Sequence, residues 1–246
     1  MNRPFLVDLD ITGRQVEIEA WDEFSSAVDD DAKDGLVEAM STFAKLGAAG
    51  ALSGAGLDPG QAGAILARRG FARREGHCTF QDVRIAPASI CVLLNMLHWV
   101  HLEVKPVSKV RISWLAIGQL ADPLAVQFPE QWPRPSFRLS IGDLLGDIDV
   151  NIEFDKPQSQ EAADSVVKAM SIWLLSSHRG AYADNDFDPS KSAIYLGPDV
   201  MEVSPDRIIW FVEVMRCNES ALYGLINLLE WVHQKIAPIR YVEIGP

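Results

Sequence analysis

The chain is poor in cysteine and lacks long apolar runs. Its three cysteines, Cys78, Cys91 and Cys217, are widely spaced and form no CxxC pair. An odd, scattered set argues against a disulfide framework and favours a reducing compartment. No apolar stretch approaches the about 20 residues that span a bilayer, and the N-terminus meets Asp8 too early for a secretory signal. We therefore expect a cytoplasmic protein that does not bind membranes.

Basic residues are also scarce. The chain has 22 Lys and Arg against 34 Asp and Glu, a net charge of −12. Residues 1–125 carry 16 acids and 12 bases (−4), whereas residues 126–246 carry 18 acids and 10 bases (−8). An acidic surface repels phosphate backbones, which disfavours nucleic acid as a main partner, and it speeds the encounter with a basic protein. A solvated surface without a specific partner is the simpler alternative.

Established catalytic and cofactor signatures are missing. The sequence has no Gly-x-Ser-x-Gly, HExxH, P-loop or paired CxxC, and the small-residue segment 47–56 lacks GxGxxG order and βαβ context. His77 and Cys78 are neighbours in an expected strand, so they point to opposite faces and make no nucleophile–base couple. We expect no cofactor and no metal, and favour a protein that is not an enzyme. Segment 47–56 is interpreted as a frayed helix end or a mobile loop.

The sequence does contain an internal repeat. An 18-residue signature at 95–112 returns at 227–244, with Asn, Leu, Trp, Val, His, Pro, Val and Ile in the same places. Further matches follow in the same order at offsets of 130 to 134, including 34–41 with 164–171. Such an ordered set predicts a tandem duplication. We expect repeat one over 1–119, a proline-rich connector over 120–132 and repeat two over 133–246.

The hydrophobic patterns predict a ββα(x)βαβ unit in each repeat. Alternation indicates strands and helical spacing indicates helices. The expected strands are 5–11, 15–21, 79–85, 137–141, 148–154, 193–196, 200–203 and 207–216, and the expected first helices are 31–46 and 158–176. The signature helix and a final strand close each repeat. Asp58-Pro59 resembles an N-cap with proline at the first helical position, and predicts a short helix to about Arg69.

This pattern predicts the α+β class. We expect the helices to pack on a mixed, mostly antiparallel sheet, and the two repeats to adopt a pseudo-twofold arrangement. The pattern leaves open whether the repeats share one sheet or fold separately.

The signature helix carries three polar or aromatic positions that both repeats share. They are Asn95, Trp99 and His101 in repeat one and Asn227, Trp231 and His233 in repeat two. The histidines fall within the apolar stripe, where a strand carbonyl or amide can satisfy the ring. The Asn–Trp pairs lie on the far side of the helix, and a groove for a partner is the alternative to packing there. We interpret all six as structural.

Two segments have no equivalent in the other repeat. The first contains Arg68, Arg69, Arg73 and Arg74, whose guanidinium groups suit a phosphate or carboxylate. The second contains Asp184, Asp186 and Asp188, which resemble the start of a calcium loop but lack its glycine and its glutamate. Both are weak candidate binding sites, and a solvated helix end and a solvated acidic loop are their simpler explanations.

Two functional hypotheses remain. The first is a non-enzymatic protein of bacterial type that binds a basic protein, similar in charge and size to acidic immunity or inhibitor proteins. The second is an enzyme or small anionic-ligand binder whose site lies between the repeats and uses the arginines with His77, His178 or the aspartate segment. A homo-oligomer with a contact through segment 47–56 is a further hypothesis.

Overall fold

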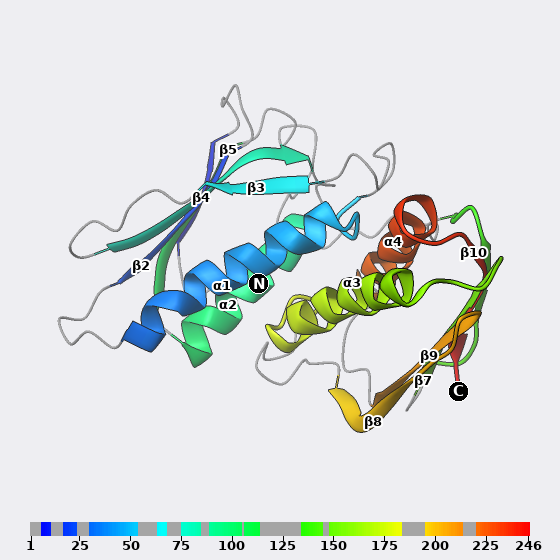
Figure 1. Cartoon of the computed structure of the whole chain (residues 1–246). Helices are drawn as coiled ribbons and strands as arrows, with labels where there is room; N and C mark the ends of the chain where they lie inside the picture. The colour runs from blue at the N-terminus through cyan, green and yellow to red at the C-terminus, as the bar shows by residue number, and fades with distance from the viewer. Residues whose placement is uncertain are drawn as a thin grey trace.

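The computed structural model describes residues 6–10, 17–23, 30–53, 63–67, 75–84, 89–104, 106–113, 134–144, 148–183, 195–213 and 220–246. These residues form an α+β protein with two units of the same order, ββαββαβ (Figure 1). The first unit contains β1 (Leu6–Asp10), β2 (Glu17–Glu23), α1 (Asp30–Ala48), β3 (Gly63–Ala67), β4 (Glu75–Arg84), α2 (Ser89–Glu103) and β5 (Val107–Ser113). The second contains β6 (Arg138–Ile141), β7 (Ile148–Phe154), α3 (Gln160–His178), β8 (Tyr195–Val203), β9 (Arg207–Glu213), α4 (Ser220–Lys235) and β10 (Ile239–Gly245).

The strands form two separate five-stranded sheets with matching orders. The first sheet has the order β1-β5-β2-β4-β3 and the second the order β6-β10-β7-β9-β8. In each sheet the first strand lies parallel to the last, and the remaining neighbours are antiparallel. The mixed, mostly antiparallel character expected from the sequence is therefore confirmed. The two units do not share one sheet, because each forms its own.

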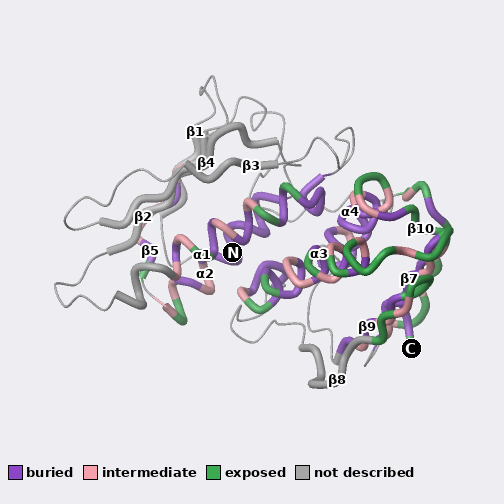
Figure 2. Tube along the Cα trace, in the orientation of Figure 1, coloured by how far each residue is buried: buried purple, intermediate pink, exposed green. Residues whose placement is uncertain are grey.

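The four helices lie between the two sheets, and α1 runs beside α3 (Figure 1). The inward positions of β7, at Ile148, Val150, Ile152 and Phe154, are each at most 3% exposed. Residues 89–97 of α2 are buried on every side, and 224–230 of α4 are too. Buried residues accordingly run through the helices, whereas β10 combines buried residues with exposed ones (Figure 2). A helix covered all round must contact more than its own sheet.

Both long helices end in the same turn. After α1, Gly50 has a φ of 74°, and after α3, Gly180 has a φ of 67°. Ala51 N–H donates to the Leu46 carbonyl, and Ala181 N–H donates to that of Ser176. This geometry is the glycine-terminated C-cap, which satisfies carbonyls that the helix leaves unpaired. Residues 49–53 are buried in this turn, so the expectation of a frayed end or a mobile loop is wrong for this part of segment 47–56.

The helix predicted between Asp58 and Arg69 is wrong. Residues 63–67 form strand β3, which pairs antiparallel with β4. Tertiary pairing decides the structure here, because Ile65 and Leu66 supply strand-forming residues beside an open edge of the sheet. The Asp58-Pro59 signature itself lies outside the described residues.

One edge strand was predicted as two. The expected strand at 193–196, from Tyr195 on, and the expected strand at 200–203 both belong to β8, whose register shifts between Leu196 and Met201. Gly197 and Pro198 lie at that shift, and proline is tolerated in a sheet at an edge or a bulge because it lacks an N–H. The proposed connector 120–132 lies outside the described residues. Among those residues, no helix is both long and apolar enough to cross a membrane.

Candidate functional site

The shared asparagines connect the two halves of the chain. Asn95 on α2 donates from Nδ2 to the carbonyls of Ala181 (3.2 Å) and Ala183 (3.0 Å), in the turn after α3. Asn227 on α4 donates from Nδ2 to the carbonyl of Ser53 (3.0 Å), in the turn after α1. Ser53 and Ala183 occupy matching places in the two turns. Each half thus holds the other at the same point through a buried side-chain amide.

The shared histidines lie at the corner between the signature helix and the last strand. Val107 N–H donates to His101 Nδ1 (3.1 Å), and Ile239 N–H donates to His233 Nδ1 (2.9 Å). An Nδ1 that accepts this bond places the ring proton on Nε2. The carbonyl oxygens of the same two residues lie 3.2 and 3.1 Å from Nδ1. The geometry closes the helix–strand corner in both halves.

The shared tryptophans are half-buried against the core. Trp99 and Trp231 both pack on the apolar cluster that fills the space between sheets and helices. They follow Asn95 and Asn227 by one helical turn, on the side of the helix that faces the other half. The shared positions therefore all contact protein, through backbone bonds or apolar packing.

A buried carboxylate on α4 was not predicted from the sequence. Glu230 is 8% exposed and accepts hydrogen bonds from Ser136 N–H (2.8 Å), the Ser136 hydroxyl (2.7 Å) and Gln234 Nε2 (2.9 Å). Burial alone raises the pKa of Glu230, but these hydrogen bonds and the nearby His233 outweigh it, so the pKa lies below its usual value. The matching residue in the first half is His98. This difference within the shared signature was the sequence feature that could have indicated a special role for Glu230.

A second unpredicted contact joins α3 to α1. Arg179 Nη2 lies 2.9 Å from Glu38 Oε2, and Nη1 donates to the hydroxyl of Thr42. The preceding residue, His178, is the last residue of α3 rather than part of a loop. Burial, with a smaller effect from the Arg179 charge, lowers the pKa of His178. The position that matches Arg179 in the first half is Ala49, so this tie has no reciprocal copy.

The two non-shared candidate segments lie outside the described residues. This holds for Arg68, Arg69, Arg73 and Arg74, and for Asp184, Asp186 and Asp188. The aspartate segment runs from Ala183, which Asn95 binds, to Tyr195, the first residue of β8. Within the described ranges, no group of three His, Cys, Asp or Glu side chains is placed to hold a metal ion.

Comparisons with known proteins identify no family. No family model and no curated protein matches the chain. Among solved structures, it is similar to a chain of complex III2 from Candida albicans with Inz-5 bound, at 10% identity and a TM-score of 0.23. The match covers 95% of this chain and 80% of that one. A likeness this weak supports no inference about function.

Proposed function

We propose that the chain is a tandem duplication whose halves pack with pseudo-twofold symmetry. Three observations support this: the same strand order in both sheets, the same glycine turn after α1 and α3, and reciprocal bonds from Asn95 and Asn227. A reciprocal pair of this kind is the signature of an isologous contact, in which one surface meets its own equivalent.

On this scaffold we propose a non-enzymatic function: binding of a basic protein partner, in the manner of acidic immunity or inhibitor proteins. The observation that carries this proposal is the role of the shared polar side chains. Asn95, Asn227, His101 and His233 all bind backbone atoms. Their structural role therefore accounts for their presence in both halves. We infer that surface residues recognise the partner, and the net charge of −12 favours a cationic one.

Affinity capture from the native lysate tests this function. The tagged chain is washed at low and then at high salt, and the eluates are identified by mass spectrometry. We expect one stoichiometric basic protein that salt releases, because screening weakens charge-driven contacts. The purified partner must then bind the chain directly, with an affinity that falls as salt rises. A bait without a partner, or a partner whose affinity ignores salt, would contradict the proposal.

Substitution of the four arginines tests the alternative hypothesis of an anionic-ligand site. Exchange of Arg68, Arg69, Arg73 and Arg74 for alanine makes the chain more acidic. Under the proposed function, affinity for a basic partner is retained or increased. An anionic-ligand site would instead lose its ligand in this variant, with no change in thermal stability.

A further inference from the structure

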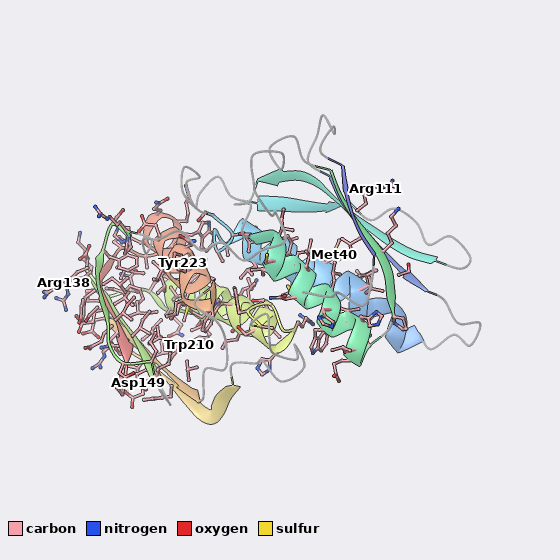
Figure 3. The ribbon with its side chains drawn as sticks, turned by 180° about the vertical axis from the view of Figure 1, so that it is seen from behind. Met40, Arg111, Arg138, Asp149, Trp210 and Tyr223 are labelled. Atoms are coloured by element: carbon pink, nitrogen blue, oxygen red, sulfur yellow. The ribbon has the colours of Figure 1, made fainter. Side chains whose placement is uncertain are left out.

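The outer face of the second sheet, turned away from the helices, can be read from its register. Along one row across the sheet lie Ser140, Glu243, Asn151, Ile209 and Glu202. One step towards the C-terminal end of β10, Asp149 pairs with Phe211. Their sheet neighbours Val150, Ile152, Ile208 and Trp210 are buried on the helix side. Since successive strand residues alternate between faces, these seven residues lie on the outside. Figure 3 shows Arg138 and Asp149 on this side.

At one end of this face each of three arginines contacts a neighbouring side chain. Arg240 Nη2 lies 2.8 Å from Glu153 Oε2, and Arg207 Nε donates to Asn151 Oδ1 at 2.8 Å. The Arg138 guanidinium lies 5.6 Å from the centroid of the Tyr241 ring, a cation–π distance. Each of the three arginines therefore has a partner within the face itself.

At the other end the carboxylates have no such partners. In the part of the chain that the structure describes, Asp149, Glu202 and Glu243 form no ion pair or hydrogen bond. Glu202 and Glu243 are exposed. Between them lie Ile209 and Phe211, two half-buried apolar side chains on β9. We call these five residues the acid-rimmed patch.

We propose that the acid-rimmed patch is the docking surface for a basic partner. Charge complementarity selects the occupant: its cationic side chains meet the carboxylates of Asp149, Glu202 and Glu243, and an apolar group covers Ile209 and Phe211. An interface of this design places apolar contact at its centre and charges at its rim. Asn151, which is 8% exposed and fixed by Arg207, gives the patch a rigid floor. This inference rests on the proposed function and assigns it a place on the molecule.

The test compares two full-length variants with the same charge change. The patch variant carries Asp149→Asn, Glu202→Gln and Glu243→Gln. The control variant carries Glu103→Gln, Asp155→Asn and Glu161→Gln, at exposed positions outside the patch. Each change raises the net charge from −12 to −9. The probe is a synthetic peptide of alternating lysine and leucine, and its affinity is measured by calorimetry at low and moderate salt. Circular dichroism checks that both variants fold.

We expect the patch variant to bind the peptide about tenfold more weakly than the control, since three surface charge contacts each contribute modestly. A further variant, Phe211→Ser, should weaken binding without changing its salt dependence. Equal losses in both charge variants would show that net charge alone attracts the peptide, and would overturn the proposal. An unchanged affinity in the patch variant, or no binding by the parent chain, would overturn it as well. The lysate experiment is independent of these outcomes, so a salt-sensitive partner that ignores the patch changes would leave the proposed function standing.

Discussion

The two halves fill matching positions of the core with different volumes. The first half has Leu52 in the turn after α1 and Val92 on α2. The second half has Tyr182 and Gly224 at the corresponding places, 130 and 132 residues later. A Cβ atom added to Gly224 would lie 2.8 Å from Tyr182 Oη. The second half thus has a large and a minimal side chain where the first half has two of medium size, so the two halves divide the volume differently at matching positions.

The shared asparagine and histidine contacts differ much less between the halves than the apolar packing does. Both halves keep the asparagine bond to the opposite turn and the histidine bond to the last strand. A hydrogen bond needs a particular donor at a particular place, whereas a core accepts any set of side chains with the right total volume. The comparison therefore separates positions fixed by geometry from positions fixed only by volume.

The largest effect should come from breaking the Tyr182–Gly224 fit. Tyr182→Leu leaves a void in a site that is 1% exposed, and should lower the free energy of unfolding by about 3 kcal/mol. Gly224→Val forces a side chain against the ring, and should cost about 2 kcal/mol. The double variant restores the first-half combination, so it should be more stable than the sum of the single changes implies, by about 1 kcal/mol or more. Urea unfolding measures all three, and strict additivity would refute the idea of exchanged volume.

The asparagine bonds should rank next. Asn95→Ala removes two hydrogen bonds to carbonyls of the opposite turn, and should cost about 2 kcal/mol. Asn227→Ala removes the bond to Ser53, and should cost about 1 kcal/mol. Chemical unfolding gives both values, and hydrogen exchange at residues 49–53 and 180–183 locates the loosened turn. Each variant should loosen the turn of the opposite half; loosening confined to its own half would contradict the cross-half assignment.

Much of the element order could be predicted from the sequence. The alternation in 148–154 matches β7 residue for residue, because the apolar residues on one face are all buried, whereas Asp149 and Glu153 on the other face are half-buried. Because most elements occur in two similar segments of the sequence, each could be predicted twice, and the two predictions together indicated the α+β class. The sequence predicted that Asn95 lies on a packed face of its helix. It could not predict the hydrogen-bond partners Ala181 and Ala183, because they lie 86 and 88 residues away in the chain.

The features that could not be predicted from the sequence depend on tertiary contacts. Residues 63–67 are strand only because β4 offers an edge, and no local pattern reveals that edge. Glu230 looks like an ordinary surface acid of a helix until Ser136 is placed above it. Segment 47–56 was interpreted as a frayed helix end or a mobile loop, because the turn after Gly50 receives its hydrogen bonds from Asn227 and Ser89 on other helices. Long-range contacts therefore set the limit of the sequence interpretation.

Glu230 provides a pH-dependent contrast, because its counterpart His98 carries no carboxylate. The pKa of Glu230 is lowered in the folded protein, so ionised Glu230 stabilises the fold above the usual carboxyl pKa, and this stabilisation is lost as the pH falls through the lower, folded-state pKa. Glu230→Gln should cost about 1 kcal/mol at neutral pH and progressively less in acid. Unfolding of both proteins across this range measures the difference. A gap that stays constant with pH would contradict the assignment.

The smallest expected effect is a difference in stability between substitutions of two buried tryptophans in the second half. Trp173 donates from Nε1 to the Ala221 carbonyl at 3.0 Å, whereas Trp210 Nε1 is buried and has no hydrogen-bond partner among the residues that the structure describes. Trp173→Phe recreates the Phe43 of the first half, but it leaves the Ala221 carbonyl without this donor and should cost about 1 kcal/mol more than Trp210→Phe. In Trp210→Phe, relief of the unpaired N–H offsets part of the lost packing, because an unsatisfied buried donor is itself costly. Thermal and urea unfolding of the two variants give this difference, and an equal or larger loss in Trp210→Phe would mean that the Trp210 N–H has a partner in solution.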